Sequence, residues 1–345
     1  MKKPIMIIQW IWVSIIATMI VMPLCIQAEE STLRVMSYNI HRGGTIHLKQ
    51  PLSQTAKIIQ EAKADVVGIQ ETRSPKGVNS EQLAQLLGWN YYVHPKNNVI
   101  ITRYEIVEKM KTGIKVKLPS GQGAYIFNLH LKPSYYMPNQ FLGIKPRWPK
   151  NDKPFVPVIK TEAEAIASLK ENPGKQIAEL LKKIRSLPDE EAPVFVVGDF
   201  NEPSHLDWTE ATAKAGRHPL KVAYPTSKAF AEAGFGDAYR TIYPDEMKNP
   251  GMTWSSKYKD DDPTSHPDRI DFVYFKGKGL QVNEVKVVGE DKEKADIVVT
   301  PFPSDHRAVV ATFTLIDGEY PAPACDPFRL RAPPDSDPIK VSEGR

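Results

Sequence analysis

Short apolar runs, rich in β-branched and aromatic residues, recur after residue 32 and predict β-strands. Turn-forming residues bound each run, which distinguishes strands from buried helices of similar composition. Clear runs cover residues 33–40, 64–69, 124–131, 194–197, 270–275 and 308–315, and weaker ones cover 99–102 and 282–288. The polar segments between them leave room for helices, so the pattern favours an α/β fold.

Helical spacing fills several of the gaps between the predicted strands. Residues 53–62 and 81–87 carry apolar side chains three and four positions apart, with Ser80 as the expected cap of the second helix. Thr161 to Glu164 form a capping-box pattern, and an apolar stripe follows at Ile177, Leu180, Leu181, Ile184 and Leu187. Pro173 and its neighbours should break the helix between these two signals. Together the elements predict one mixed α/β domain over residues 31–316.

The first 28 residues predict export. Lys2 and Lys3 precede an apolar segment over residues 5–24, and Ala28 followed by acidic residues offers a cleavage site. A signal peptide is therefore expected, so that the protein is periplasmic or secreted. The alternative is an uncleaved membrane anchor, because about 20 apolar residues can span a bilayer.

Two further segments differ in composition from the rest. Residues 133–160 hold six prolines and five aromatic residues, and directly follow the strand that ends near His130. An ordered loop beside a binding cleft is expected there, with Tyr135 and Trp148 as candidate substrate contacts. Residues 317–345 are proline-rich and charged, and predict a flexible tail. The net charge of +4 is too small to indicate a polyanionic partner by itself.

Polar side chains of a few types stand at the ends of the predicted strands. Each alone is more often a turn former or a surface residue. As a set they are unusual, because strand ends on one edge of a sheet can converge on one cleft. The set comprises Asn39, Glu71, His130, Asp199, Asn201, Asp271, Asp305 and His306. On an extended segment Asp199 and Asn201 would point the same way, with Phe200 packed behind them. His41, His47, His205 and His266 are expected at turns or on the surface.

The motifs SYNI, GIQE, NLHL, GDFNEP, DRIDFV and SDHRAV, in that order over residues 32–315, resemble the endonuclease/exonuclease/phosphatase (DNase I-like) superfamily. The resemblance implies a four-layer α/β sandwich, in which two mixed β-sheets pack face to face with helices outside. It also implies hydrolysis of phosphoric esters by attack of a metal-assisted water. No serine-nucleophile, Walker or zinc-protease motif competes with this interpretation.

Carried over residue by residue, the resemblance implies that Asn39, Glu71 and Asp305 hold a divalent ion, Glu71 directly. Oxygen ligands of this kind suit Mg²⁺ or Mn²⁺ rather than zinc. Asp199 would orient and deprotonate the attacking water, and Asn201 and His130 would donate hydrogen bonds to phosphoryl oxygens. A pair of Asp271 with His306 would keep the imidazole protonated beside the developing charge.

The substrate stays open among several phosphoesters. An exported phosphodiesterase that can be a nuclease is favoured, with Trp254 as a further candidate for stacking on a base. A phosphomonoesterase or a sphingomyelinase-like lipid phosphodiesterase is the alternative, and a non-catalytic binding protein a remote one. The expected partner is a phosphoester, with nucleic acid as one candidate. A membrane is expected only at an uncleaved N-terminal segment, and no obligate protein partner is evident.

Overall fold

The computed structural model describes residues 31–75, 77–94, 98–132, 136–144, 159–170, 173–257 and 266–315. The export segment, the tail, Tyr135, Trp148 and most of the loop at 133–160 lie outside these residues, so the corresponding expectations stay predictions. Among the described helices, none combines the length and the apolar character needed to cross a bilayer.

Two mixed sheets form the centre of the fold. The first has the order β14-β13-β15-β1-β2-β6-β5 and the second β11-β12-β10-β9-β8-β7. The strands of the first sheet are β1 (Ser31–Asn39), β2 (Val66–Gln70), β5 (Asn90–His94), β6 (Asn98–Thr102), β13 (Leu280–Gly289), β14 (Ile297–Val298) and β15 (Ala308–Leu315). Those of the second are β7 (Glu105–Lys109), β8 (Gly113–Lys117), β9 (Gly123–His130), β10 (Val194–Asp199), β11 (Gly236–Asp237) and β12 (Asp271–Lys276). A short ribbon, β3 (Arg73–Ser74) with β4 (Gly77–Val78), stands apart.

The central strands carry apolar side chains on both faces of their sheet. One face packs against the other sheet, and the opposite face packs against helices. In β1, Leu33 and Val35 point into the core between the sheets, whereas Met36 and Tyr38 point to the outer helices. Phe195 of the second sheet meets Phe313 of the first edge to face, with ring centroids 4.9 Å apart. Because the outer face of each sheet is also apolar, helices have to cover it, and the structure shows such helices on both sheets.

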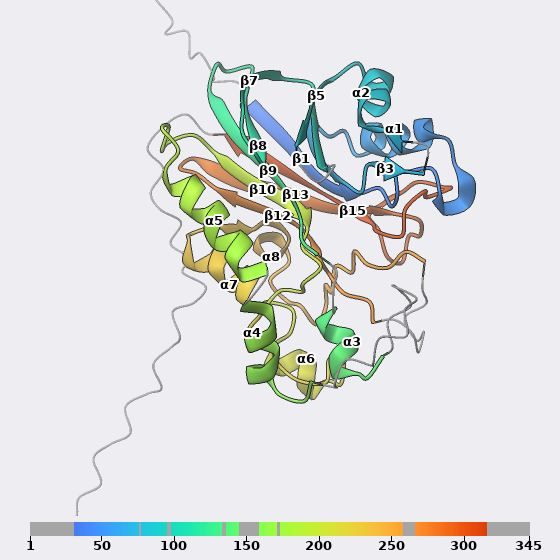
Figure 1. Ribbon diagram of the computed structural model, residues 1–345, viewed down its shortest axis with the longest axis vertical. Helices are drawn as coiled ribbons and strands as arrows, with labels where there is room; N and C mark the ends of the chain where they lie inside the picture. The colour runs from blue at the N-terminus through green and yellow to red at the C-terminus, as the bar shows by residue number, and fades with distance from the viewer. Residues whose placement is uncertain are drawn as a thin grey trace, which may run out of the picture.

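The helices form the outer layers, as Figure 1 shows. Helices α1 (Leu52–Glu61) and α2 (Ser80–Leu87) cover the first sheet, and α5 (Pro173–Arg185) and α7 (Pro225–Glu232) cover the second. The shorter α3 (Met137–Phe141), α4 (Glu162–Lys170) and α6 (Glu210–Lys214) gather at one end, while α8 (Ala238–Ile242) lies against β12 and β13. A 3₁₀ turn, η1 (His47–Lys49), precedes α1. The order helix, sheet, sheet, helix confirms the predicted four-layer α/β sandwich.

The predicted elements agree with the structure to within one or two residues at most boundaries. The Thr161 capping box is present, since the Thr161 Oγ1 accepts from the Glu164 N–H at 3.3 Å and the Glu164 carboxylate accepts from the Thr161 N–H at 3.1 Å. The expectation for Ser80 was wrong. Ser80 is the first helical residue of α2 and Asn79 precedes it as the cap position.

A buried carboxyl joins the loop after β10 to the start of α7. Glu202 accepts hydrogen bonds from the Thr226 backbone N–H and from its hydroxyl, both at 3.0 Å. The first N–H groups of a helix have no partner within the helix, so Glu202 satisfies one of them from a distance. Burial raises the pKa of Glu202 to about 7 even though these two hydrogen bonds lower it.

Stability should therefore depend on pH through Glu202. The folded pKa, about 7, exceeds the ordinary value of 4.5, so this contribution is fully present below about pH 4.5 and is lost as the pH rises through 7. Glu202→Gln keeps an acceptor without the ionisation. Between pH 5 and 8 the free energy of unfolding of the wild type should fall relative to this variant by about 2–3 kcal/mol, measured by urea denaturation. Parallel pH profiles of the two proteins would contradict this.

Candidate active site

Sheet topology brings the polar strand ends to one edge. Strands β1 and β2 are parallel with Asn39 opposite Gln70, so Glu71 follows directly beside Asn39. Strands β9 and β10 are also parallel and place His130 opposite Asp199. The antiparallel β12 begins at this edge, with Asp271 opposite Asp199 on its other side. Side chains separated by up to 232 positions in the chain thus meet where the two sheets end.

The last motif reaches the same edge because β15 runs antiparallel to β1. Just before β15, the Ser304 hydroxyl donates to the Asn39 carbonyl at 2.6 Å, and the His306 N–H donates to the Ser304 hydroxyl at 3.1 Å. These bonds fix the direction from which His306 enters the site.

Asn39 connects the two sheets through its side chain. Its Nδ2 donates to Asp199 Oδ2 at 2.9 Å and to Glu71 Oε1 at 3.2 Å. Its Oδ1 accepts from the His41 N–H at 2.9 Å. In this arrangement Asn39 holds the two carboxylates in place and its oxygen turns to the backbone, so its predicted role as a metal ligand stays a prediction.

Glu71 directs a carboxylate out of the buried edge toward solvent. Its side chain is 30% exposed, and its Oε2 accepts from the Arg42 N–H at 3.1 Å. The backbone at Glu71 has a φ of +57°, a conformation that costs a residue with a Cβ on the order of 1 kcal/mol or more and is typical of functional sites. The hydrogen bond of 2.6 Å from the Gly43 N–H to the Glu71 carbonyl holds it.

His130 faces both carboxylates. Its Nε2 lies 3.5 Å from Asp199 Oδ2 and 4.0 Å from Glu71 Oε1. The side chain is 22% exposed, so the imidazole borders the open side of the site. An N–H at this place is available to an oxygen bound between His130 and the two acids.

Asp199 is almost fully enclosed, with a side chain 1% exposed. Burial raises the pKa of Asp199 to about 6, with His306 and His130 opposing that rise and Asp271 adding to it. A carboxylate whose pKa lies close to neutrality is a better proton acceptor than an exposed one. Asp199 therefore suits the predicted role of deprotonating a water.

Asp271 fixes His306. Its Oδ2 lies 3.0 Å from His306 Nδ1, and His306 Nε2 lies 3.7 Å from Asp199 Oδ2. Burial by itself would lower the pKa of His306, but the charges of Asp271 and Asp199 outweigh it and raise the pKa well above the ordinary value. His306 is therefore protonated at neutral pH, as expected from the sequence.

Asn201 reaches the site by a different route from the one predicted. Its φ is +47°, and its N–H donates to Asp199 Oδ1 at 2.8 Å, which makes a turn rather than an extended segment. Its Nδ2 donates to the Leu131 carbonyl at 3.0 Å, and the second hydrogen of that amide can serve a substrate oxygen. Phe200 is buried as expected, among Phe230, Phe272 and Tyr274.

Asp305 pairs with a histidine that the sequence argument set aside. His41 Nδ1 lies 2.8 Å from Asp305 Oδ1. His41 stands in a turn, as expected, but its pairing with Asp305 was not predicted. Burial would raise the pKa of Asp305, but the hydrogen bond from His41 and the charge of His306 lower it to about 2. The signal in the sequence was the position of His41, two residues beyond Asn39 at the same strand end.

The donors fit a divalent ion that keeps part of its own water. Among the described residues, Asp199, Asp271 and His306 form one of two groups of His, Cys, Asp or Glu in which three ligand atoms converge. A protonated His306 cannot ligate, and Glu71 and Asp305 belong to neither group. Magnesium is commonly bound through one or two carboxylates, waters and substrate phosphate oxygens. The Glu71 carboxylate, 30% exposed, meets that requirement.

An aromatic wall borders His306. The backbone of Trp254 pairs with both Asp268 and His306, and the Trp254 ring meets Tyr136 edge to face at 5.3 Å. The backbone of Trp254 therefore lies beside that of His306, and the expected contact of Trp254 with substrate stays a prediction. Tyr136 was not singled out from the sequence, because one tyrosine in an aromatic segment carries no distinguishing signal.

Comparison with known proteins agrees with this geometry. The model of the Endonuclease/Exonuclease/phosphatase family matches residues 36–306, so the chain belongs to this family and is a phosphoric ester hydrolase. An uncharacterized protein of Caenorhabditis elegans is 29% identical over 315 residues, which cover 84% of this chain and 93% of that protein.

Solved structures resemble the chain at lower identity. A family protein of Beutenbergia cavernae is 18% identical, with a TM-score of 0.49 over 82% of this chain and 72% of that one. TDP2 of D. rerio, complexed with a single-strand DNA product, is 19% identical, with a TM-score of 0.47 over 82% and 99%.

Replacing Asp271 tests the protonation of His306. Asp271→Asn keeps the shape of the acceptor but removes the charge that raises the pKa of His306. At neutral pH kcat for phosphodiester hydrolysis should fall by about 10²–10³-fold, as when a transition-state donor is lost. The loss should be smaller at low pH, where His306 is again protonated. A kcat profile that keeps its shape from pH 5 to 9 and is merely scaled down would contradict this role.

Proposed function

We propose that this protein is an exported phosphodiesterase that depends on Mg²⁺ or Mn²⁺ and acts on nucleic acid. The observation that carries the proposal is the junction of Asn39, Glu71, His130 and Asp199. The Asn39 amide donates to both the partly exposed Glu71 carboxylate and the buried Asp199 carboxylate. The His130 imidazole lies within 4.0 Å of the same two carboxylates.

The residues divide the chemistry between them. Asp199 accepts a proton from a water held beside it, because its pKa of about 6 combines ionisation at neutral pH with appreciable basicity. His130 and Asn201 direct N–H groups at the phosphoryl oxygens. Protonated His306 donates toward the charge that grows in the transition state, where a preorganised donor is most effective. No side chain needs to form a covalent bond to phosphorus.

Glu71 is the residue placed to hold the metal ion, with Asp305 as a further candidate. When bound, such an ion acts as a Lewis acid on the phosphoryl group and neutralises part of its negative charge. The hydrogen bond from the Arg42 N–H and the left-handed backbone at Glu71 orient the carboxylate before the ion binds. This preorganisation supports the assignment of Glu71 over the buried Asp199 as the principal ligand.

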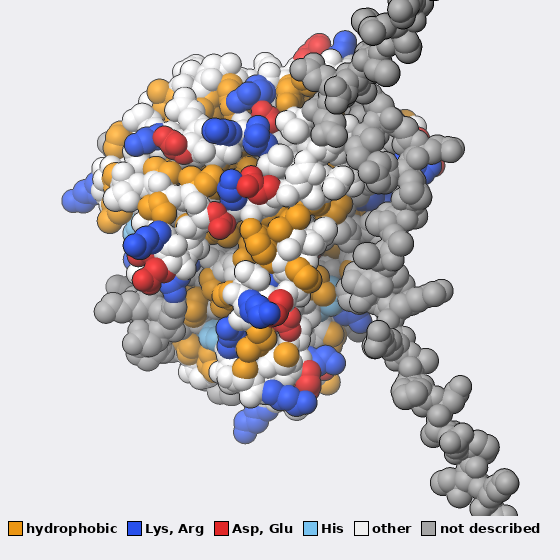
Figure 2. All heavy atoms as spheres, turned by 180° about the vertical axis from the view of Figure 1, so that it is seen from behind, with side chains coloured by type: hydrophobic (Ala, Val, Ile, Leu, Met, Phe, Trp, Pro, Cys, Tyr) orange, Lys and Arg blue, Asp and Glu red, His pale blue; other side chains and the backbone are white. Residues whose placement is uncertain are grey.

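Nucleic acid is favoured over lipid by the aromatic wall beside His306. A base can stack on Trp254 or Tyr136 while its phosphate lies at the histidine, and such stacking tolerates different bases. On the face shown in Figure 2, basic and acidic side chains alternate and do not gather into one basic field. This face therefore offers no basic field along which a long duplex would be held.

Hydrolysis of bis-p-nitrophenyl phosphate provides the first test. Activity should require added Mg²⁺ or Mn²⁺ and disappear with a chelator. Glu71→Gln and Asp199→Asn should each lower kcat/KM by about 10²–10⁴-fold, the range for loss of a general base or of charge stabilisation. Glu61→Gln, at the exposed end of α1, is the matched control and should retain full activity. Wild-type rates in either site variant would refute the proposal.

The substrate class needs a separate comparison. Single-stranded DNA, RNA, sphingomyelin, inositol phosphates and a phosphomonoester should be supplied to the same preparation. The proposal expects the highest kcat/KM for single-stranded nucleic acid, and Trp254→Ala should raise KM for that substrate more than for the small diester. Preference for sphingomyelin or for a monoester would leave the hydrolytic site intact and overturn the nucleic-acid assignment.

A further inference from the structure

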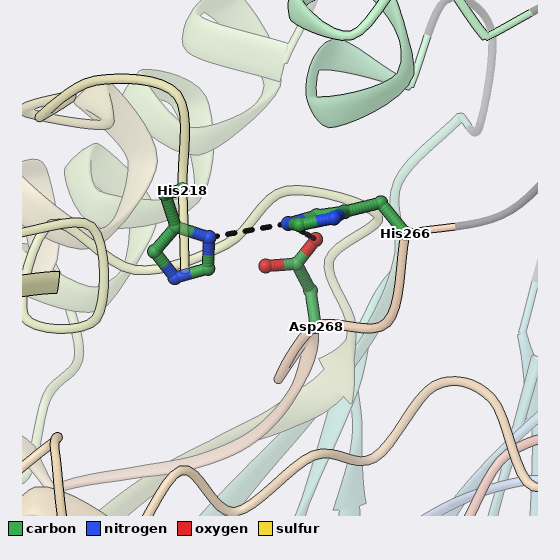
Figure 3. Close-up of side chains that lie close together, drawn as sticks. All are labelled: His218, His266 and Asp268. Atoms are coloured by element: carbon green, nitrogen blue, oxygen red, sulfur yellow. Dashed lines mark hydrogen bonds and ion pairs between the residues drawn. The ribbon is translucent and has the colours of Figure 1, made fainter. Parts of the chain in front are cut away.

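A second convergence of ligand-type side chains lies apart from the catalytic residues. His218, in the loop after α6, faces His266 and Asp268 on the segment that leads into β12 (Figure 3). The three side chains turn their polar atoms toward one another, with the Asp268 carboxylate directed at the space beside the two rings. All three ligand atoms lie within 4.8 Å of one another.

The distances suit a small tetrahedral ion. His218 Nδ1 and His266 Nε2 are 3.1 Å apart, and His266 Nε2 is 3.9 Å from Asp268 Oδ2. Two ligands at ordinary zinc distances with tetrahedral angles stand about 3.3 Å apart. The two imidazole nitrogens are within a few tenths of an ångström of this separation, whereas Asp268 has to move closer to the two rings to complete the site.

Charge balance gives an independent reason for a cation. Arg240 and Arg269 lie near, but they pair with Asp207 and Asp237 at 2.6–2.9 Å. The positive charges of Arg240 and Arg269 are thus neutralised by Asp207 and Asp237, and neither arginine is left to neutralise Asp268. Asp268 is left 2% exposed, and within the described residues no lysine or arginine forms an ion pair with it. Without a cation Asp268 is protonated, because burial raises its pKa well above the ordinary value. A bound metal ion would offset the cost of ionising this carboxyl group.

The surroundings of Asp268 resemble the outer shell of a metal site. The Trp208 Nε1–H donates to Oδ1 at 2.9 Å, and the Tyr136 hydroxyl donates to Oδ2 at 2.7 Å. The Trp208 ring also stacks on His218, with centroids 4.2 Å apart and planes 12° apart. Such contacts fix the orientation of ligands before the ion arrives. The His266 side chain is 15% exposed, which leaves a path from solvent.

From these observations we infer that His218, His266 and Asp268 bind one zinc ion, with a water as its fourth ligand, at a site distinct from the catalytic metal. Two imidazoles with one carboxylate favour zinc over magnesium, which selects oxygen ligands. The ion joins the loop after α6 to the segment before β12. Through Tyr136 and the backbone of Trp254, it also braces the aromatic wall beside His306.

Metal stoichiometry tests this inference directly. The protein, freed of metal with a chelator, is titrated with Zn²⁺ against a chromogenic zinc dye, in the Glu71→Gln background to weaken the catalytic site. One equivalent should compete with the dye, and Co²⁺ in its place should give the visible absorption of a four-coordinate ion. His266→Gln and the isosteric Asp268→Asn should each lose this equivalent.

His205→Gln is the matched control, because His205 is a half-buried histidine that contacts Ser227 at 2.8 Å and stands outside the cluster. It should retain the equivalent, and circular dichroism should show that the cluster variants remain folded. The inference is wrong if the parent protein fails to compete with the dye. It is equally wrong if a cluster variant keeps the equivalent.

Discussion

One hydrogen bond across the two sheets organises the active site. The Asn39 Nδ2 at the end of β1 donates to Asp199 at the end of β10 and to Glu71 beside it. Each sheet supplies half of the catalytic groups, so their separation depends on how closely the sheets pack. Gly68 allows that approach, because a Cβ there would lie 2.2 Å from a Val197 methyl. The core between the sheets therefore sets the geometry of the chemistry.

The edge of the sheets that carries the active site also buries several ionisable side chains. Water does not reach these groups to stabilise their charges. Asp199, Asp271 and His306 are each at most 7% exposed at the side chain, so their ionisation depends on one another. The buried acids raise the pKa of His306, and burial raises the pKa of Asp199 to about 6. Both pKa values are raised, but for different reasons: burial disfavours the charged form of Asp199, whereas the neighbouring carboxylates favour the charged form of His306.

The sequence predicted the strands that carry the catalytic residues, and with them the site that their ends form, but it did not predict β8. The motifs placed Asn39, Glu71, His130, Asp199, Asp271 and His306 together correctly. It did not predict the edge strands β5 and β7, because their exposed faces carry little apolar pattern. Strand alternation failed at Asn201, where a turn with positive φ replaces the extended chain. The contacts of His41 with Asp305 and of His266 with His218 were not predicted, because these partners are distant in sequence and only the fold brings them together.

The stereochemistry at phosphorus tests the account most directly. A phosphodiester analogue carrying sulfur at a chiral phosphorus is hydrolysed in ¹⁸O-labelled water, and the configuration of the thiophosphate monoester product is determined. Water activated by Asp199 attacks in line without a covalent enzyme intermediate, so the account predicts inversion. Retention of configuration would require two successive displacements through an enzyme-bound intermediate, and would contradict it.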